Sequence, residues 1–353
     1  SAVPVYPIQE RLAAFEAHYG KPLKFYHGDL MDYDGLRGAL EETSPDAIVH
    51  LGEMPSAPYS MIDQSRAAYT QSNNVIGSLN VLWAMHEVAP HAHLVKLGTM
   101  GEYGTPNMDI PEGFFEIEYR GRRDVLPFPR QANSFYHLTK VHDSNNTMFA
   151  CRTWGLRSTD IMQGVVFGTQ IDEMGDDPRL RSRLDFDQSF GTAINRFACQ
   201  AVIDHPLTVY GTGGMKRGFL PLRDSMQCLG IAIENAPPEG EYRVFNQFEE
   251  TYTIAELAER VKEAGEAAGL SVEIEHYENV RTERNEHYYN PDRNHLINLG
   301  YTPHHDVVAE VKIMLRDLMP HRDRILAKRD ILVPDIRWTG GRRRAQVIEV
   351  SPQ

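Results

Sequence analysis

The chain has 353 residues and a formal net charge of −13, with 41% hydrophobic and 24% charged residues. This composition is typical of a globular protein with one large domain or two fused ones. The acidic balance argues against nucleic acid as a partner, because affinity for phosphate backbones comes from Lys and Arg. The sequence shows neither a run of about 18 apolar residues nor an apolar leader, so we expect no membrane span and no membrane partner.

The three cysteines, Cys151, Cys199 and Cys228, are scattered and none has a CxxC partner. This spacing predicts neither a zinc site nor a disulfide framework. Isolated thiols suit a reducing compartment and are usually buried. We therefore expect a cytoplasmic protein with buried cysteines and no bound metal.

Strand and helix patterns alternate over the first 168 residues. Short apolar runs predict strands, and apolar residues at i, i+3 and i+4 predict helices. The strands are expected at 23–26, 47–51, 93–98 and 156–164, and the helices at 33–43, 63–88 and 134–154. This alternation predicts an α/β fold with βαβ units and a doubly wound, Rossmann-type parallel sheet.

Beyond residue 168 the pattern loosens, and residues 168–187 are charged and loop-like. Helices are expected near 190–204, 223–235, 254–268 and 306–327, with short strands at 207–210 and 242–245. We therefore divide the chain into a Rossmann-type domain, 1–168, and a smaller α/β region, 169–353, with some segments returning to the first domain. Arg342, Arg343 and Arg344 are expected to form a solvated tail or an arm that packs on a neighbouring subunit.

Three residues form a candidate catalytic set. Thr99 follows an apolar strand pattern, and parallel sheets place their chemistry at the carboxyl ends of strands. Tyr136 and Lys140 are four residues apart, so they share one face of the expected helix. Tyrosine has a pKa of about 10, too high for a base at neutral pH. A nearby lysine ammonium favours the phenolate, which could then accept a proton from a hydroxyl that Thr99 also contacts.

This arrangement resembles the extended short-chain dehydrogenases/reductases that act on nucleotide sugars, and within them a branch that adds sulfite to the sugar. Seven segments carry the resemblance and are spread over nearly the whole chain: 56–63, 73–82, 95–110, 134–146, 163–168, 205–211 and 286–290. The 4,6-dehydratases of the same superfamily have Thr-Asp-Glu at the strand end. This chain has Met100 and Gly101 after Thr99, which favours the sulfite-adding branch.

The resemblance implies NAD as cofactor and a UDP-glucose-like nucleotide sugar as substrate. The C4 hydroxyl is first oxidised, water is lost across C5 and C6, sulfite adds at C6, and the C4 ketone is reduced again. It implies that Thr99, Tyr136 and Lys140 are the catalytic triad and that Glu102 and His137 transfer protons at C5 and C6. A helix-surface role for His137 and a loop-capping role for Glu102 are the alternatives.

The resemblance also implies the binding residues, with 1–168 as the NAD-binding domain and 169–353 mainly binding substrate. The residues expected to bind the cofactor are Asp29, Leu30, Leu51, Gly52, Glu53, Asn74, Tyr136, Lys140 and Gln163, with Asn74 holding Lys140 or its water. Those expected to bind substrate are Arg183, Asn195, Thr208, Arg217, Gln247 and Arg281. Arg217 is expected to grip the diphosphate, since a guanidinium offers forked donors. The long helices 63–88 and 134–154 are expected to build a homo-oligomer, a dimer or a tetramer.

The chain departs from the family in two places. Dinucleotide-binding folds have a Gly-rich turn after their first strand, and no such turn is found. Either it lies ahead of Ser1, or the protein does not bind NAD in the family's manner. The family also has polar residues where this chain has Met54, Pro55, Met162 and Pro221.

These departures leave three functions open. The first is a sulfite-adding synthase, and sulfite is then a substrate. The second is a 5,6-dehydratase of a sugar nucleotide or nucleoside that stops at the exocyclic alkene. The third is a binding or scaffold protein without a cofactor.

Overall fold

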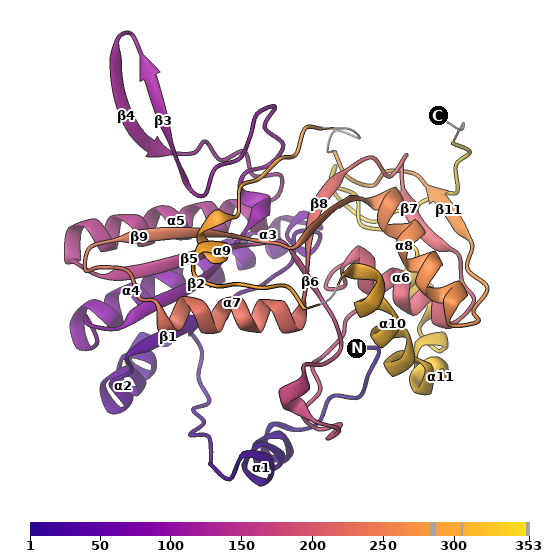
Figure 1. The fold of residues 1–353 in the computed structure, drawn as a ribbon, viewed down its shortest axis with the longest axis horizontal. Helices are drawn as coiled ribbons and strands as arrows, with labels where there is room; N and C mark the ends of the chain where they lie inside the picture. The colour runs from indigo at the N-terminus through magenta and orange to yellow at the C-terminus, as the bar shows by residue number, and fades with distance from the viewer. Residues whose placement is uncertain (283–286, 305, 351–353) are drawn as a thin grey trace.

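A four-stranded parallel sheet forms the centre of the first part of the molecule (Figure 1). The computed structural model describes residues 1–282, 287–304 and 306–350. Strands β1 (Ala47–His50), β2 (His93–Thr99), β5 (Arg157–Gln163) and β9 (Tyr242–Gln247) lie in the order β1-β2-β5-β9. The four strands expected at 47–51, 93–98, 156–164 and 242–245 are thus confirmed, and β9 joins the sheet from the second half of the chain.

Helices cover both faces of this sheet, as a buried parallel sheet requires. Helices α4 (Gly77–Val88) and α5 (Phe135–Trp154) lie over one face, with α2 (Tyr33–Thr43) packed against α4. Helix α7 (Leu222–Glu234) contacts β2 from the other face. The single helix expected over 63–88 is α3 (Gln64–Gln71) and α4, joined by a π-helical turn over Ser72–Ile76.

The strand expected at 23–26 is wrong, because residues 21–29 follow an irregular path and Leu23, Phe25 and Tyr26 are exposed. A strand needs a neighbour to receive its backbone hydrogen bonds. In the described part of the chain β1 is the outer strand, and no strand pairs with its free edge. Helix α1 (Ile8–Tyr19) was not expected, and it contacts the 168–187 loop through a hydrogen bond from Arg11 to the Arg181 carbonyl, 2.7 Å.

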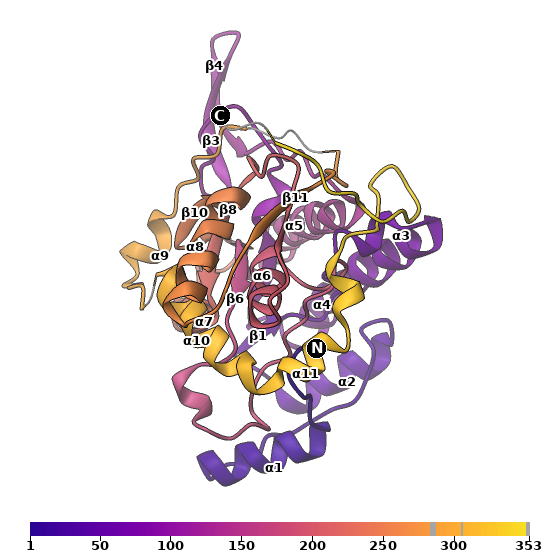
Figure 2. The same ribbon diagram turned by 90° about the vertical axis from the view of Figure 1, so that its right-hand side faces the viewer.

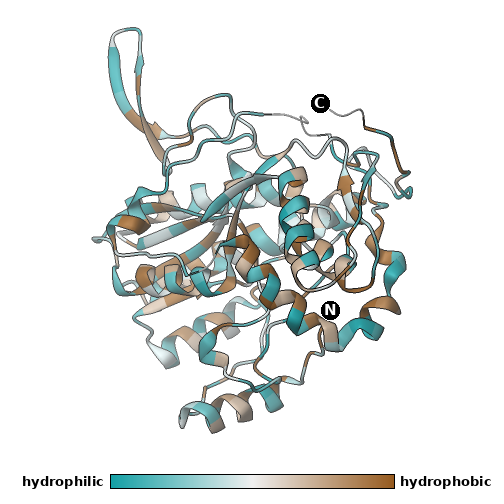
Figure 3. Ribbon diagram, turned by 45° about the vertical axis from the view of Figure 1, so that its right-hand side comes forward, coloured by the Kyte–Doolittle hydropathy of each residue, from teal (hydrophilic) through white to brown (hydrophobic). Residues whose placement is uncertain are grey.

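The second part of the molecule is built around an apolar core. A three-stranded sheet has the order β10 (Glu250–Thr253), β8 (Lys216–Pro221), β6 (Val165–Phe167), and β7 (Leu207–Tyr210) pairs with β11 (Ile274–Tyr277). Helices α6 (Ala193–Val202), α8 (Ile254–Ala267) and α10 (Val307–Leu318) pack on one another, and their buried residues form most of this core. Figure 3 shows hydrophilic and hydrophobic residues alternating around these outer helices.

Shorter elements complete this part. The helix expected over 306–327 is divided into α10 and α11 (Arg322–Leu326), because Pro320 lies in the turn between them. Helix α9 (Asn294–Asn298) returns to the sheet and contacts β9. Of the segments that carried the family resemblance, Glu286 lies outside the described residues, as do residues 351–353 at the end of the second region.

Two extensions leave the body of the protein. The hairpin of β3 (Phe114–Tyr119) and β4 (Arg122–Pro127) projects from the sheet region (Figure 1) and was not expected from the sequence. The segment after α11 runs back across the molecule toward α3 (Figure 2), where the Gly341 amide donates to the Ile62 carbonyl, 3.2 Å. No helix in the described residues is both long and apolar enough to cross a membrane.

The basic cluster belongs to this C-terminal segment and is not a free tail. Arg342 pairs with Asp335 at 3.1 Å, and the Arg343 guanidinium lies 3.4 Å from Glu278. The Ile348 amide donates to the His276 carbonyl on β11, 2.9 Å. The segment therefore packs on its own chain, which neither sequence-based expectation had anticipated.

Candidate active site

Thr99 is the last residue of β2, so it lies at the carboxyl end of the sheet. A short 3₁₀ turn, η3 (Met100–Glu102), follows it, and Thr99 caps this turn. The Thr99 hydroxyl accepts from the Gly101 amide, 3.1 Å, and Glu102 Oε1 accepts from the Thr99 amide, 3.4 Å. This reciprocal capping box fixes the backbone of Thr99 at the strand end.

Tyr136 and Lys140 lie on the first turns of α5, whose N-cap Ser134 accepts from the His137 amide at 3.1 Å. The Lys140 ammonium donates to the Leu97 carbonyl, 2.5 Å, and lies 2.6 Å from Glu53 Oε2. It also lies 5.9 Å from the centre of the Tyr136 ring. The tyrosine and the lysine thus share one helix face, as their spacing predicts, and α5 carries them to the strand end beside Thr99.

The electrostatics differ from the expectation for Tyr136. Burial raises the pKa of the Tyr136 phenol above its usual range, and the nearby Glu53 carboxylate raises it further. The buried Lys96 ammonium acts in the opposite direction but is a smaller influence, and the nearby Lys140 ammonium is itself paired with Glu53 at 2.6 Å. Tyr136 is therefore a neutral phenol in this arrangement, and its activation as a base requires additional positive charge.

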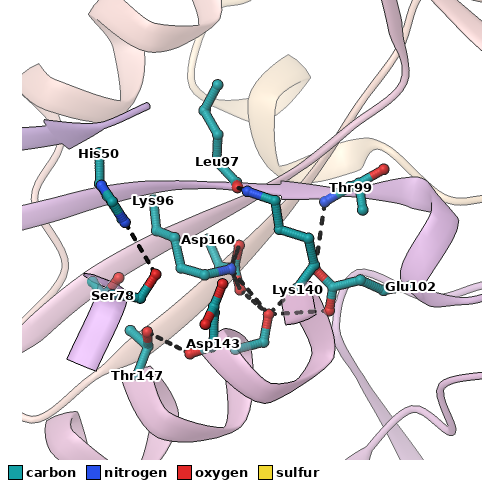
Figure 4. Close-up of polar contacts among 12 residues, drawn as sticks. His50, Ser78, Lys96, Leu97, Thr99, Glu102, Lys140, Asp143, Thr147 and Asp160 are labelled. Atoms are coloured by element: carbon teal, nitrogen blue, oxygen red, sulfur yellow. Dashed lines mark hydrogen bonds and ion pairs between the residues drawn. The ribbon is translucent and has the colours of Figure 1, made fainter. Parts of the chain in front are cut away.

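Glu102 faces a buried charged cluster rather than a cavity (Figure 4). Its carboxylate pairs with Arg130 and accepts from the Ser144 hydroxyl, 3.1 Å. The Ser144 oxygen also lies 2.6 Å from Asp160, so its single proton is shared between the two carboxylates, and the Asp160 carboxylate pairs with Lys96 at 3.2 Å. These contacts favour the capping alternative for Glu102, with the cluster holding the loop after Thr99 in place.

His137 lines a cavity at the strand end together with Thr99. Its Nδ1 atom lies 3.1 Å from the Ser134 hydroxyl. Its ring packs against Gly101, where a Cβ atom would come within 2.4 Å of His137 Nε2. Because Gly101 has no side chain, the His137 imidazole can lie over this turn and line the cavity.

Two cavities of about 190 Å³ each adjoin along the boundary between the two parts of the molecule. The strand-end cavity is lined by Ala57, Thr99, Met100, Gly101, Gly104, His137, Gln163, Gly164, Val165, Arg217, Gly218, Arg281 and Tyr289. The outer cavity is lined mainly by residues 55–58, residues 188–193, Val165, Arg196, Tyr210, Met215, Arg217, Phe219, Ile254 and Arg281. Ala57, Val165, Arg217 and Arg281 line both, so the two cavities lie side by side, and we refer to them together as the cleft.

The structure brings together only some of the expected substrate residues. Arg217 and Arg281 lie where the two cavities meet. Thr208 and Gln247 are fully buried and support other side chains: Thr208 accepts from Arg196, 3.0 Å, and Gln247 accepts from Gln163, 2.9 Å.

Arg183 and Asn195 do not line either cavity. Arg183 pairs with Asp185 at 2.6 Å and lines a separate depression beside Arg342, Arg343 and Arg344. The Asn195 side chain donates to the Asp185 carbonyl, 3.4 Å. Both residues therefore belong to the wall behind the outer cavity.

The expected cofactor residues gather beside the carboxyl end of β1. Leu30 packs over Gly52, where a Cβ atom would come within 2.9 Å of the leucine side chain, while Leu51 is 60% exposed. The Asp29 carboxylate accepts from the Met31 amide, 2.9 Å. Asn74 does not hold Lys140, because it bonds instead to both backbone groups of Met54 and to the Thr139 hydroxyl, 3.0 Å.

Arg196 was missed by sequence reasoning, although it lines the outer cavity. It is 4% exposed, and its guanidinium lies 4.7 Å from the centre of the Tyr210 ring. A signal was present in the sequence: Arg196 is the one charged residue in the otherwise apolar and small-residue helix α6. Phe190 and Tyr289, which also line the cleft, carried no comparable signal.

The fold and this site define the class of protein. Residues 3–246 match the NAD dependent epimerase/dehydratase family, and the chain belongs to that family. It is 49% identical over 338 residues to the chloroplastic UDP-sulfoquinovose synthase of Spinacia oleracea, covering 96% of this chain and 70% of that protein. It is 47% identical over 339 residues to the UDP-sulfoquinovose synthase of Sulfolobus acidocaldarius, covering 96% of this chain and 86% of that protein.

Solved structures share the fold at lower identity. The UDP-glucuronic acid 4-epimerase of Bacillus cereus in complex with UDP-glucuronic acid and NAD is 17% identical, with a TM-score of 0.67, covering 90% of this chain and 88% of that one. The UDP-glucose 4-epimerase of Thermotoga maritima with UDP-glucose is 18% identical, with a TM-score of 0.66 and 84% of each chain covered. The α/β, Rossmann-type fold expected from the sequence is confirmed.

The family and these relatives make the protein an NAD-dependent sugar-nucleotide enzyme, which sets aside the cofactor-free alternative. The described residues fit the nicotinamide end of the cofactor. The buried Glu53 carboxylate is held by the Lys140 ion pair at 2.6 Å, and its oxygens accept no other hydrogen bond from the described residues. Tyr136, Lys140 and Glu53 would hold that end, where NAD supplies a hydride acceptor and later a hydride donor.

Proposed function

We propose that the protein converts a UDP-glucose-like nucleotide sugar by oxidation at C4 and elimination across C5 and C6, followed by sulfite addition at C6. The shared lining of the two cavities is the observation that carries the proposal. Two arginines, Arg217 and Arg281, lie at the junction, where a diphosphate would lie. The sugar then enters the strand-end cavity with Thr99 and His137, and the nucleoside enters the outer cavity.

In this proposal Thr99 and Tyr136 contact the C4 hydroxyl of the sugar. The Tyr136 phenolate accepts the hydroxyl proton as the C4 hydrogen leaves as hydride, and the product is a C4 ketone. The Glu53 carboxylate would be attracted by a positively charged nicotinamide ring at this place, which would weaken its ion pair with Lys140. The Lys140 ammonium could then stabilise the phenolate. Thr99 donates to the developing ketone oxygen, and the capping box that includes Glu102 keeps it in position.

His137 is assigned to the elimination. The C4 ketone acidifies the C5 proton, and the His137 imidazole, which lies in the strand-end cavity, takes this proton. The same imidazolium then gives the proton to the C6 hydroxyl, which leaves as water as the C5–C6 double bond forms. Sulfite enters as bisulfite, forming its C–S bond at C6 while its proton goes to C5. Return of the hydride to C4 and of the proton from Tyr136 to the C4 oxygen completes the cycle.

A second candidate is a 5,6-dehydratase that releases the alkene without sulfite. Among the described residues lining the strand-end cavity, the arginines and lysines are Arg217 and Arg281 alone. Both also line the outer cavity, so a sulfite anion would share its cations with the diphosphate. Pro55, which lines the outer cavity, and its neighbour Met54 stand where the family has polar residues, which favours this candidate over a sulfite-adding enzyme on local chemistry alone.

Product mass separates the two candidates. The full chain is incubated with UDP-glucose and NAD, with and without sulfite, and the nucleotide products are analysed by mass spectrometry. A UDP-sulfosugar that forms only with sulfite supports the first candidate. A product lighter by one water in both incubations supports the second, and unchanged UDP-glucose in the presence of bound NAD contradicts both.

We also propose a dimer through α3, α4 and α5. Tyr69, Ile76 and Trp83 recur every seven residues along this helical run and are 50%, 40% and 43% exposed, and Phe149 on α5 is 51% exposed. Exposed aromatic groups on neighbouring helices are typical of a protein interface. Sedimentation of the wild type should give twice the chain mass, and Trp83→Glu should give the monomer. A wild-type monomer would contradict the proposal.

The cytoplasm, or another reducing compartment, is the proposed location. Cys151, Cys199 and Cys228 are all buried free thiols. Thiols that have no disulfide partner persist where the redox environment is reducing. Fluorescence microscopy of the tagged full-length gene product in its source cells tests this proposal, and a secreted product would contradict it.

A further inference from the structure

We propose that Arg196 reads the nucleobase of the substrate, by donating hydrogen bonds to a carbonyl oxygen of a pyrimidine ring. This inference rests on the proposed nucleotide-sugar function and adds a specificity-determining residue to it. Arg196 lies on α6 and lines the outer cavity but not the strand-end cavity. It is therefore on the far side of Arg217 and Arg281 from the reacting sugar.

The first argument is the charge of Arg196. Its side chain is 4% exposed, and no carboxylate in the described residues forms an ion pair with it. The described residues that line the outer cavity include no Asp or Glu. A buried cation is stable only when acceptors satisfy it, so the cavity is prepared for a ligand rich in acceptor oxygens.

The second argument is the orientation of the guanidinium. Its Nε atom donates to the Thr208 hydroxyl, 3.0 Å, and Nη2 donates to the Thr208 carbonyl, 3.4 Å. Gln200 holds Thr208 in turn, accepting from its amide at 3.1 Å and donating to its hydroxyl at 3.0 Å. Of the five guanidinium donors, two are thus used within the protein, and the edge that carries the others is held in a fixed direction.

The third argument is the shape of the surroundings. Phe190, Tyr210, Met215 and Ile254 line the same cavity, and the Tyr210 ring covers the Arg196 guanidinium at 4.7 Å. Flat apolar walls suit an aromatic ring better than a tetrahedral phosphate. Because the proposed function assigns Arg217 and Arg281 to the diphosphate, a base carbonyl is the acceptor that we assign to this end of the cleft.

Binding of two ligands to the full chain tests the inference, using titration calorimetry with UDP and with ribose 5-diphosphate, which lacks the base. Arg196→Gln is expected to weaken UDP binding about 10- to 100-fold, the effect of losing a charge-assisted hydrogen bond, and to leave ribose 5-diphosphate unchanged. Arg196→Lys should remain weak for UDP, because it keeps the charge and loses the fixed donors. The matched control Arg217→Gln should weaken both ligands alike.

Equal weakening of both ligands by Arg196→Gln would place Arg196 on the phosphates and overturn the inference, as would unchanged UDP binding or full recovery in Arg196→Lys. Thr208→Val tests the same idea if Arg196→Gln does not fold, since it removes the hydroxyl that orients the guanidinium and should weaken UDP alone. A wild type that binds ribose 5-diphosphate but not UDP overturns the base contact only. A wild type that binds neither ligand overturns the proposed function as well.

Discussion

The two parts of the molecule support the cleft with opposite kinds of interior. Beneath the strand-end cavity, the interface between α5 and the sheet contains the charged side chains of Lys96, Glu102, Asp143 and Asp160, all 1% exposed or less. Around the outer cavity, the core formed by α6, α8 and α10 is apolar, with Phe197, Leu257 and Val311 fully buried. The first interior is rich in paired charges, whereas the second is mainly apolar and contains few buried charges, among them Arg196 and Glu310.

This difference follows from the chemistry of each cavity. A reacting sugar needs groups whose protonation and direction are controlled, and fixed charges in a dry interior act strongly on them. A nucleoside needs cavity walls that match its shape. A tightly packed apolar core holds such walls in place without burying unpaired charges. The two interiors should therefore respond differently to substitution and to pH.

The largest effect is expected at the reacting group. Tyr136→Phe removes the proton acceptor and should lower kcat about 10²- to 10⁴-fold, the usual contribution of a general base. The affinity for UDP should not change, because Tyr136 does not line the outer cavity. Steady-state kinetics and UDP titration on the same preparation check both statements, and a loss of UDP binding would mean that the two cavities are not independent.

The next effect is on stability in the charged half. Lys96→Met leaves the buried Asp160 carboxylate without its 3.2 Å ion pair and should reduce the free energy of unfolding by about 3–5 kcal/mol. Adding Asp160→Asn removes the unpaired charge and should recover most of that loss, because the Ser144 and Tyr242 contacts remain. Urea unfolding measures the free energy of unfolding of the wild type, the single variant and the double variant. Equal values for all three would show that the ion pair contributes little.

A pH-dependent effect comes third. Burial lowers the pKa of His93 to about 4, and the ring lies 2.9 Å from the Thr159 hydroxyl. In the unfolded chain this histidine protonates near pH 6.5. Its contribution to the free energy of unfolding is therefore fully present above pH 6.5 and is lost as the pH falls toward 4. The loss should reach up to about 3 kcal/mol for this histidine. His93→Gln should show a flatter stability profile over this window, and an unchanged slope would contradict the assignment.

The smallest effect is expected in the apolar half. Ile194→Val removes one methyl group from a fully buried position and should cost about 0.5–1.5 kcal/mol. The change involves no titratable group, so the difference from wild type should be the same at pH 5 and pH 8. Thermal and urea unfolding at the two pH values check it, and a pH-dependent difference would mean that the two interiors are coupled.

The sequence predicted the elements whose pattern is local. The strands β1 and β2 are mainly apolar runs, and α5 begins where Ser134 supplies a cap. The error at 23–26 has a different origin, because the residues have strand character but lack a neighbouring strand among the described residues. Pairing is a property of the whole fold, and no local pattern shows it.

The candidate site shows the same limit. The Thr99, Tyr136 and Lys140 set followed from strand ends and helix spacing, which are local features. Glu102 and Arg183 were named because of the family resemblance. The Arg130 ion pair holds the Glu102 side chain in the interior, and Arg183 pairs with Asp185 outside the cleft. Arg196 could be found only by asking what balances a single charge in an apolar helix.

The shared lining by Arg217 and Arg281 has a consequence for substrate choice. In the proposed binding mode, the base binds at one end of the cleft, the sugar binds at the other, and the two arginines hold the diphosphate between them. The distance between the two ends then selects the number of phosphates in the linker. A sugar joined to its nucleoside through one phosphate is too short, so it can seat its base or its sugar but not both. Length, as well as chemical identity, then decides which molecules reach Thr99.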